Sequence, residues 1–215
     1  MFKILMAVVL IIVLVVLGGS AIFRYQFEQE TEEKVNELFS SVSKNETEIK
    51  TNDLNNLPVP VKNWLEDTGI LEEPAINSAR SLQRAEMRLE DQGTLVRFLA
   101  EIVWIPSAAL SDYITWEEIN LNSARATMSF GDITAAGVFT FNDRGEPIGF
   151  TAERYRDVDG EFEMETWSIS MDNYQMFDGI KVPAAGEITW ELAEGDFTWY
   201  KFEIKEFEYN QPEVY

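Results

Sequence analysis

Residues 123–141 read SARATMSFGDITAAGVFTF, and this stretch decides the fold. Apolar and polar side chains alternate along 123–130 and again along 133–141, and a Gly-Asp pair separates the two runs. A period of two is typical of a strand with one buried face, and a short spacer between two such runs favours an antiparallel hairpin. The stretch therefore predicts two neighbouring strands that share an apolar face.

The same pattern extends in both directions from this hairpin. Further strands are predicted at 114–119, 147–156, 162–171, 187–192 and 197–209, with a weaker one at 76–89. Turn sequences such as Asp157-Val158-Asp159-Gly160 and Asp178-Gly179 separate them, which favours hairpins over parallel crossovers. In the last strand the apolar phase changes, and a bulge near Tyr200 would reconcile it.

Two helices are predicted to cover the apolar face of the sheet. Residues 61–68 form a short one that ends at Gly69. Residues 92–103 form a clearer one, with Leu95, Phe98, Leu99 and Ile102 at helical spacing. The predicted class is α+β but mostly β: an antiparallel meander, as a curved sheet or half-open barrel, packed on one or two helices.

The N-terminus predicts a membrane anchor. Lys3 is followed by an apolar run from Ile4 to Phe23, and a helix of about 20 apolar residues is long enough to cross a bilayer. The alternative is a cleaved signal peptide that ends at the small residues 18–21. We favour an uncleaved single-pass anchor with the body of the protein outside the cytoplasm.

Three segments follow from this interpretation. Residues 1–23 are the predicted transmembrane anchor, 24–56 a polar stalk, and 57–215 a single β-rich extracytoplasmic domain. About 190 residues remain after the anchor, which suffices for one domain with a substantial core.

Composition argues against several function classes. The net charge is −21, and such a surface repels phosphate backbones, so nucleic acid is not an expected partner. Cysteine and histidine are both absent, which removes disulfides, Ser-His-Asp triads and the usual zinc ligands. No catalytic residue, metal site or cofactor is predicted.

The predicted sheet face supplies candidate ligand contacts. An apolar ligand between sheet and helix would meet inward-facing side chains from several strands: Met128, Phe139, Phe141, Phe150, Phe162, Met164, Ile188 and Trp190. The alternative is that the same residues form an ordinary filled core, because apolar stripes usually pack against each other. The small residues Ala135, Ala136 and Gly137 fit either interpretation, since they leave room for a ligand or for a helix.

Charged residues near this face suggest a structural pair. Glu101 precedes an apolar segment of the predicted helix, and Arg154 continues the inward parity of Phe150. We therefore expect Glu101 and Arg154 to pair where helix and sheet meet. The carboxylates of Glu161, Glu163 and Glu165 lie on one face of one strand, which is typical of a solvated surface.

Three segments carry a resemblance to a known family: LAEIVWIPSAAL at 99–110, AERYR at 152–156 and VPAAGEITW at 182–190. The chain resembles, over about 57–210, a membrane-anchored prokaryotic family catalogued as a domain of unknown function. It looks internally shortened, because several strands expected between Leu89 and the helix near Asp91 are missing. The family carries no established activity. More distantly, FDGIKVP at 177–183 is similar to a hairpin of lipoprotein carriers, whose half-open barrels hold acyl chains.

The expected function is non-enzymatic binding of a lipid, an acyl chain or an envelope component by a membrane-anchored domain. One alternative is a structural or protein-interaction module with a filled core, for which an envelope protein would be the partner. Another is a carboxylate-based envelope enzyme, which requires acidic residues that converge in a cleft with raised pKa values.

Overall fold

The computed structural model describes residues 2–40, 47–87, 94–131 and 133–211. The chain divides into two compact units, one of residues 44–210 and one of 1–43 with 211–215. The described part of the smaller unit is chiefly one helix, α1 (Phe2–Ser40). Within the described ranges, no helix is found that is both long enough and apolar enough to cross a membrane.

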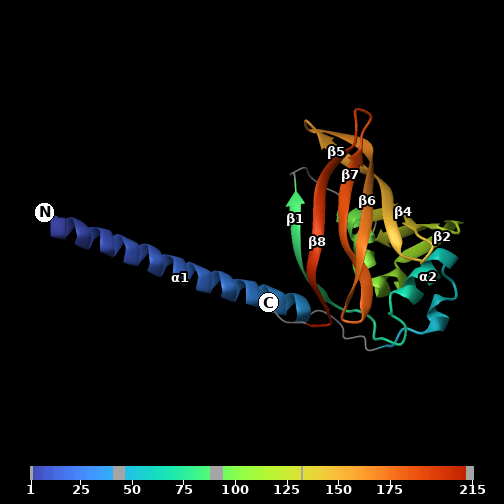
Figure 1. Ribbon diagram of the computed structural model, residues 1–215, viewed down its shortest axis with the longest axis horizontal. Coiled ribbons are helices and arrows are strands. Elements are labelled where there is room, and N and C mark those ends of the chain that lie inside the picture. The colour runs from blue at the N-terminus through green and yellow to red at the C-terminus, as the bar shows by residue number, and fades with distance from the viewer. Residues whose placement is uncertain (1, 41–46, 88–93, 132, 212–215) are drawn as a thin grey trace. The chain divides into compact units, whose positions relative to one another are not determined.

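The larger unit is built on one open antiparallel sheet of eight strands in the order β1-β8-β7-β6-β5-β4-β3-β2 (Figure 1). The strands are β1 (Ala79–Met87), β2 (Ile114–Asn120), β3 (Ser123–Phe130), β4 (Ile133–Phe141), β5 (Pro147–Val158), β6 (Glu161–Phe177), β7 (Ile180–Glu191) and β8 (Phe197–Tyr209). From β2 to β8 each strand pairs with the next along the chain, and β1 adds to the free side of β8. The predicted mostly β class and antiparallel meander are confirmed.

Two tight turns connect the longest strands. Asp159-Gly160 joins β5 to β6 and Asp178-Gly179 joins β6 to β7, and all four residues have positive φ, between 46° and 89°. Two consecutive residues of positive φ match the twist of the flanking strands, and Asp-Gly is a preferred sequence for such a turn. The Asp157 carboxylate accepts a hydrogen bond from the Gly160 N–H at 2.8 Å. Both segments are therefore hairpin turns, as expected.

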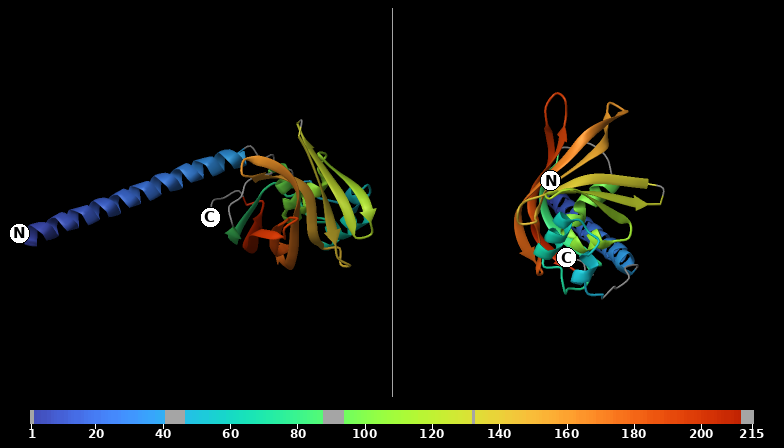
Figure 2. Two further views of the ribbon diagram at one scale, coloured as in Figure 1. Left: turned by 90° about the horizontal axis from the view of Figure 1, so that it is seen from above. Right: turned by 90° about the vertical axis from the view of Figure 1, so that its right-hand side faces the viewer.

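Short helices cover one face of the sheet, which curves round them in Figure 2. They are η1 (Thr51–Leu54), α2 (Val59–Asp67), α3 (Thr94–Glu101), η2 (Ile102–Trp104) and η3 (Pro106–Leu110). The predicted helix over 92–103 thus changes to 3₁₀ geometry after Glu101, shortly before Pro106, and its first two positions lie outside the described residues.

The core between these layers is aromatic. Trp64 of α2 is 1 % exposed and stacks on Phe139 with ring centres 6.4 Å apart. The ring centre of Phe139 lies 4.7 Å from that of Phe150. Gly137 lies beneath the Phe150 ring, where a Cβ would collide with it. The space that small residues leave on β4 is therefore filled by a neighbouring ring at this position.

The folded unit includes part of the predicted stalk. Ile49 and Leu54 are buried in the core, and Glu48 forms an isolated antiparallel bridge with Pro74. Residues 47–56 therefore belong to the larger compact unit, whereas the sequence placed the start of the domain at residue 57.

Strand ends and registers also differ from expectation. β6 continues to Phe177 and β7 begins at Ile180, so this hairpin is longer than predicted. In the β7–β8 ladder Ile188 pairs with Tyr200 and Thr189 with Thr198, which leaves Trp199 as the extra residue of a bulge. This bulge explains why the apolar residues of the last strand change from one parity to the other.

Candidate functional site

The sheet splits between β5 and its neighbour β4. β4 and β5 pair from Phe141↔Pro147 only as far as Val138↔Thr151. Beyond that point Ile133–Gly137 of β4 continue to pair with β3, and residues 152–158 of β5 continue to pair with β6. Figure 2 shows the two hairpins diverging. A groove is therefore expected where the hairpins separate.

The groove has a volume of about 940 Å³. One wall is the β3–β4 hairpin, with Met128 and Ala135, and the other is the β5–β6 hairpin, with Tyr155. Leu95, Val96 and Phe98 of α3 also line it. We call this feature the outer groove.

Large apolar side chains are exposed along the outer groove. Phe130 is 74 % exposed, Ile133 64 %, and Phe162 64 %. Met164, Tyr155, Phe98 and Tyr113 are also exposed. A soluble domain rarely exposes so many large apolar groups together unless something binds them.

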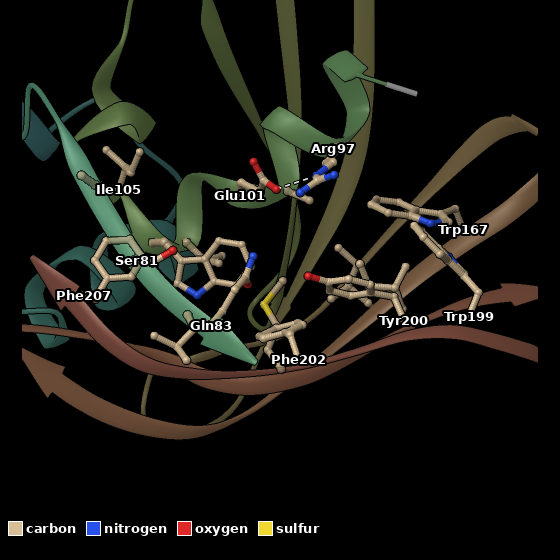
Figure 3. A pocket seen from close by; sticks show the side chains of 18 residues that line it. Ser81, Gln83, Arg97, Glu101, Ile105, Trp167, Trp199, Tyr200, Phe202 and Phe207 are labelled. Carbon is tan, nitrogen blue, oxygen red and sulfur yellow. Dashed lines mark hydrogen bonds and ion pairs between the residues drawn. The ribbon is translucent and has the colours of Figure 1, made fainter. Parts of the chain in front are cut away.

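A second, smaller cavity lies on the concave face of the sheet (Figure 3). Its volume is about 300 Å³, and it is lined mainly by β1, β6, β8, α3 and η2. The lining is mostly apolar, with polar groups from Ser81, Gln83 and Tyr200. We call it the inner cavity.

Helix α3 presents different residues to the two spaces. Leu95, Val96 and Phe98 line the outer groove, whereas Arg97 and Glu101 line the inner cavity. Arg97 Nε donates to Glu101 Oε1 at 2.7 Å, one helical turn away. This hydrogen bond raises the pKa of Arg97.

Arg154 lines the outer groove and is 7 % exposed. Its guanidinium carbon lies 4.8 Å from the ring centre of Trp167 and 5.7 Å from that of Trp190. Among the described residues no carboxylate lies within ion-pair distance of it, and its Nε–H, which is fully buried, has no acceptor. Burial, with a smaller contribution from the Arg97 cation, lowers the pKa of Arg154 to about 10.

Two tryptophans of the inner cavity also carry unused donors. The indole N–H groups of Trp167 and Trp199 are buried, and neither has an acceptor within the described part of the chain. Trp167 forms the platform for Arg154 on one side and part of the inner cavity wall. Unsatisfied buried donors are unusual in folded proteins, and here they gather where β5, β6 and β8 face α3.

The eight predicted ligand residues fall into three groups. Met128, Phe162 and Met164 line the outer groove, and Ile188 lines the inner cavity. Phe139, Phe141 and Phe150 instead pack with Trp64 in the filled core, and Trp190 is buried beside Arg154. The single lining expected from sequence parity is therefore divided. Phe162 and Met164 lie on the opposite face of the β5–β6 hairpin from Phe150, so their predicted inward parity was wrong.

The predicted pair of Glu101 and Arg154 does not form. Glu101 pairs with Arg97 along its own helix, and Arg154 stacks on tryptophan rings. Sequence parity placed Arg154 correctly on the inner face but could not identify its neighbours.

One buried carboxylate bears on the enzyme alternative. Glu146 is 3 % exposed and lies between β4 and β5, where it contacts Lys181 at 2.7 Å, Arg144 at 2.7 Å and Asn142 at 2.7 Å. Burial alone would raise the pKa of Glu146, but these hydrogen bonds outweigh it and lower the pKa to about 2. A general acid needs the opposite shift, so Glu146 is suited to a structural role.

Sequence reasoning missed several residues of the site. It did not single out Arg97 and Tyr200 of the inner cavity or Val96 of the groove as site residues, and it interpreted Trp167 and Trp199 as core or edge-covering residues in preference to a sugar-stacking surface. Alternation along 162–171 carried a signal for Trp167, since it continues the inward parity of Ile169 and Met171, all three of which are buried.

Comparison with known proteins gives one positive result. Residues 89–209, more than half of the chain, match the model of a family described as "Family of unknown function (DUF6920)". No curated protein and no solved structure was found to match. The match begins at Leu89, so the resemblance expected over 57–88 stays a prediction. The chain belongs to this family of unknown function, DUF6920.

Proposed function

We propose that this protein is a non-enzymatic binding protein that holds an apolar ligand, such as a lipid or acyl chain, in the outer groove. The observation that carries the proposal is the set of large apolar side chains exposed along both walls of that groove, among them Phe130, Ile133 and Phe162. Their exposure is unfavourable in water, and a bound apolar ligand would cover them.

The size of the groove suits such a ligand. Its volume of about 940 Å³ lies within the range of about 300–1,000 Å³ common for small-molecule sites. Each methylene of a chain that enters it gains about 0.8 kcal/mol by leaving water. Binding of a chain therefore needs no catalytic group, which agrees with a sequence that lacks histidine and cysteine.

We further propose that residues 1–23 anchor the domain to a membrane, with residues 57–215 on the extracytoplasmic side. In support, Ile4–Phe23 is an uninterrupted apolar run and belongs to a continuous helix, α1. An anchor of this kind would keep the groove close to a source of lipid. The test is fractionation: the full chain should remain in membrane pellets after alkaline wash, and a chain that begins at Arg24 should be released.

The ligand itself can be identified from the full chain. We would extract it gently from membranes and record native mass spectra, comparing the parent with Phe162→Asp and Met164→Asp. Both side chains line the groove and are largely exposed, so the fold should tolerate the change. A lipid bound in stoichiometric amount to the parent should be lost from both variants.

The matched control is Leu121→Asp. Leu121 is 73 % exposed in the turn between β2 and β3 and does not line the groove. It should retain the lipid. A parent protein that carries no lipid, or a lipid that persists in the groove variants, would contradict the proposal.

A protein-interaction module is the second candidate function. The observation that favours it is the dense packing of Trp64, Phe139 and Phe150, which fills the part of the sheet face expected to hold a ligand. In that case the groove would dock an envelope partner. The mass spectra separate the two, because a docking groove would be free of lipid after extraction.

A further inference from the structure

We propose that the outer groove selects a single-chain amphiphile with an anionic oxygen head group, and that Arg154 binds this head. The inference rests on the proposed function and specifies its ligand. Arg154 is the cation that lines the outer groove. Among the described residues no carboxylate forms an ion pair with it, although Glu165 is its cross-strand neighbour in the β5–β6 ladder.

Burial without a counter-ion is the first step of the argument. Arg154 is 7 % exposed, and its Nε–H has no acceptor in the ranges that the structure describes. A buried cation is costly unless it is paired and hydrogen-bonded. The chain holds 38 acidic residues against 17 basic ones, so the missing counter-ion does not reflect a shortage of carboxylates.

The orientation of the guanidinium is the second step. The guanidinium carbon of Arg154 lies over the rings of Trp167 and Trp190. An arginine that stacks on aromatic rings offers its N–H groups in the plane of the guanidinium, where Nε and one terminal nitrogen match the two oxygens of a carboxylate or phosphate. The unused Nε–H is one half of that two-point contact.

The surroundings of Arg154 form the third step. In the β5–β6 ladder Arg154 shares a face with Trp167, whereas Phe162 and Met164 lie on the opposite face. Arg154 lines the outer groove together with Leu95 and Met128, so an anion at Arg154 would continue into an apolar tail along these side chains. The nearest charges on α3, Arg97 and Glu101, neutralise each other. Glu153 also lines the groove, but it is exposed and accepts a hydrogen bond from Thr166 at 2.9 Å.

The test uses the full chain in nanodiscs of neutral phosphatidylcholine, titrated with dodecanoate, dodecyl phosphate and dodecanol. The three probes share a tail and differ only in the head. The parent should bind both anions about tenfold or more tightly than the alcohol, since hydrogen bonds to charged groups are the stronger kind. Comparison of the two anions distinguishes a fatty acid from a phosphate-bearing lipid.

Arg154→Met should remove the preference, with anion affinity falling about tenfold and alcohol affinity unchanged. Arg154→Lys keeps the charge without the planar fork and should lie between. Arg125→Met is the matched control, because Arg125 is exposed on β3 between the buried residues Ala124 and Ala126. It should behave as the parent.

The melting temperature of the ligand-free protein provides an independent readout, because replacing a purely structural arginine would lower it. Without ligand, Arg154→Met should raise the melting temperature, because it removes an unpaired buried charge and keeps an apolar stem on the rings. A lower melting temperature with unchanged anion binding would overturn the inference and make Arg154 a structural residue.

The outcomes separate this inference from the proposed function. Equal binding of all three probes by the parent and by Arg154→Met would overturn the anion preference and leave apolar binding intact. No binding of any probe to the parent would overturn both.

Discussion

Lys181 Nζ lies 2.7 Å from Glu146 Oε1 and 2.9 Å from Asp67 Oδ2, and so joins the β4–β5 turn to β7 and to the end of α2. The Lys181 N–H also donates to the Thr68 carbonyl at 2.8 Å. These contacts fix the corner of the domain where α2 meets the sheet. Because Glu146 takes part in these contacts as a carboxylate, they also make the stability of the domain depend on pH.

Glu146→Gln should destabilise the domain in a pH-dependent way. Because the folded-state pKa is about 2 against an ordinary 4.5, the carboxylate contributes stability above pH 4.5 that is lost as the pH falls towards 2. The contribution at neutral pH is at most about 3 kcal/mol. Urea unfolding of the full chain at several pH values should show the variant and the parent converging in acid.

Glu194→Gln serves as the control for this titration, since Glu194 is exposed in the β7–β8 turn. Its unfolding free energy should follow that of the parent at every pH. A difference between Glu146→Gln and the parent that stays constant down to pH 2 would contradict the role assigned to the carboxylate.

Gly137→Ala should cost about 1–3 kcal/mol of unfolding free energy, because the new methyl collides with the buried Phe150 ring. In a Phe150→Leu background the same change should cost much less, since the ring is gone. Gly149→Ala is the matched control: a Cβ there would meet nothing closer than 3.5 Å. Equal costs in both backgrounds would show that the ring is not the cause.

Tyr209→Phe should lower the unfolding free energy by about 0.5–1.5 kcal/mol. The Tyr209 hydroxyl donates to the Trp104 carbonyl at 2.9 Å, and the Trp104 indole donates to the Pro183 carbonyl at 2.9 Å. Burial raises the pKa of Tyr209, so the hydroxyl remains a donor. Tyr155→Phe, on a side chain that is 59 % exposed, should leave stability unchanged; an equal loss there would refute the assignment.

Phe139→Ala and Phe162→Ala should separate core from groove. Phe139 is fully buried among aromatic rings, so its truncation should cost about 3–5 kcal/mol. Phe162 is 64 % exposed, so its truncation should change stability little and reduce lipid binding instead. Thermal unfolding with lipid analysis of the same samples checks both, and a large stability loss in Phe162→Ala would place that ring in the core.

The sheet was predictable because its signals are local. Alternation along 123–141 and the Asp-Gly turns act over a few residues, and the strands at 123–130, 133–141 and 197–209 have the predicted bounds. The longer β6–β7 hairpin was missed because Asn173 and Pro183 within it resemble loop residues. At Pro183 the partner is Tyr174, and the strand continues through both.

The site was less predictable because it depends on where the layers end. Parity assigned Phe150 and Phe162 to one face, but the register pairs Phe150 with Ile169 and Asp157 with Phe162, which puts Phe162 on the opposite face of β6. The apolar residues of β6 change parity between Met164 and Trp167, so the choice of face at Phe162 was wrong. Phe162 lies near the tip of a hairpin that extends past the β4–β5 pairing. The partner of Glu101 was also missed. Glu101 pairs with Arg97, one turn earlier in the same helix, and not with a residue of the sheet.

Because β4 and β5 pair over only part of their length, the width of the outer groove between their two hairpins can change. Past Val138↔Thr151 each hairpin completes its ladder with its own partner strand. Moving the hairpins apart or together therefore breaks no described inter-strand hydrogen bond, and the resistance comes from side-chain packing. On the proposed function, the same groove would accommodate tails that differ in thickness or in the number of double bonds without a change in main-chain pairing.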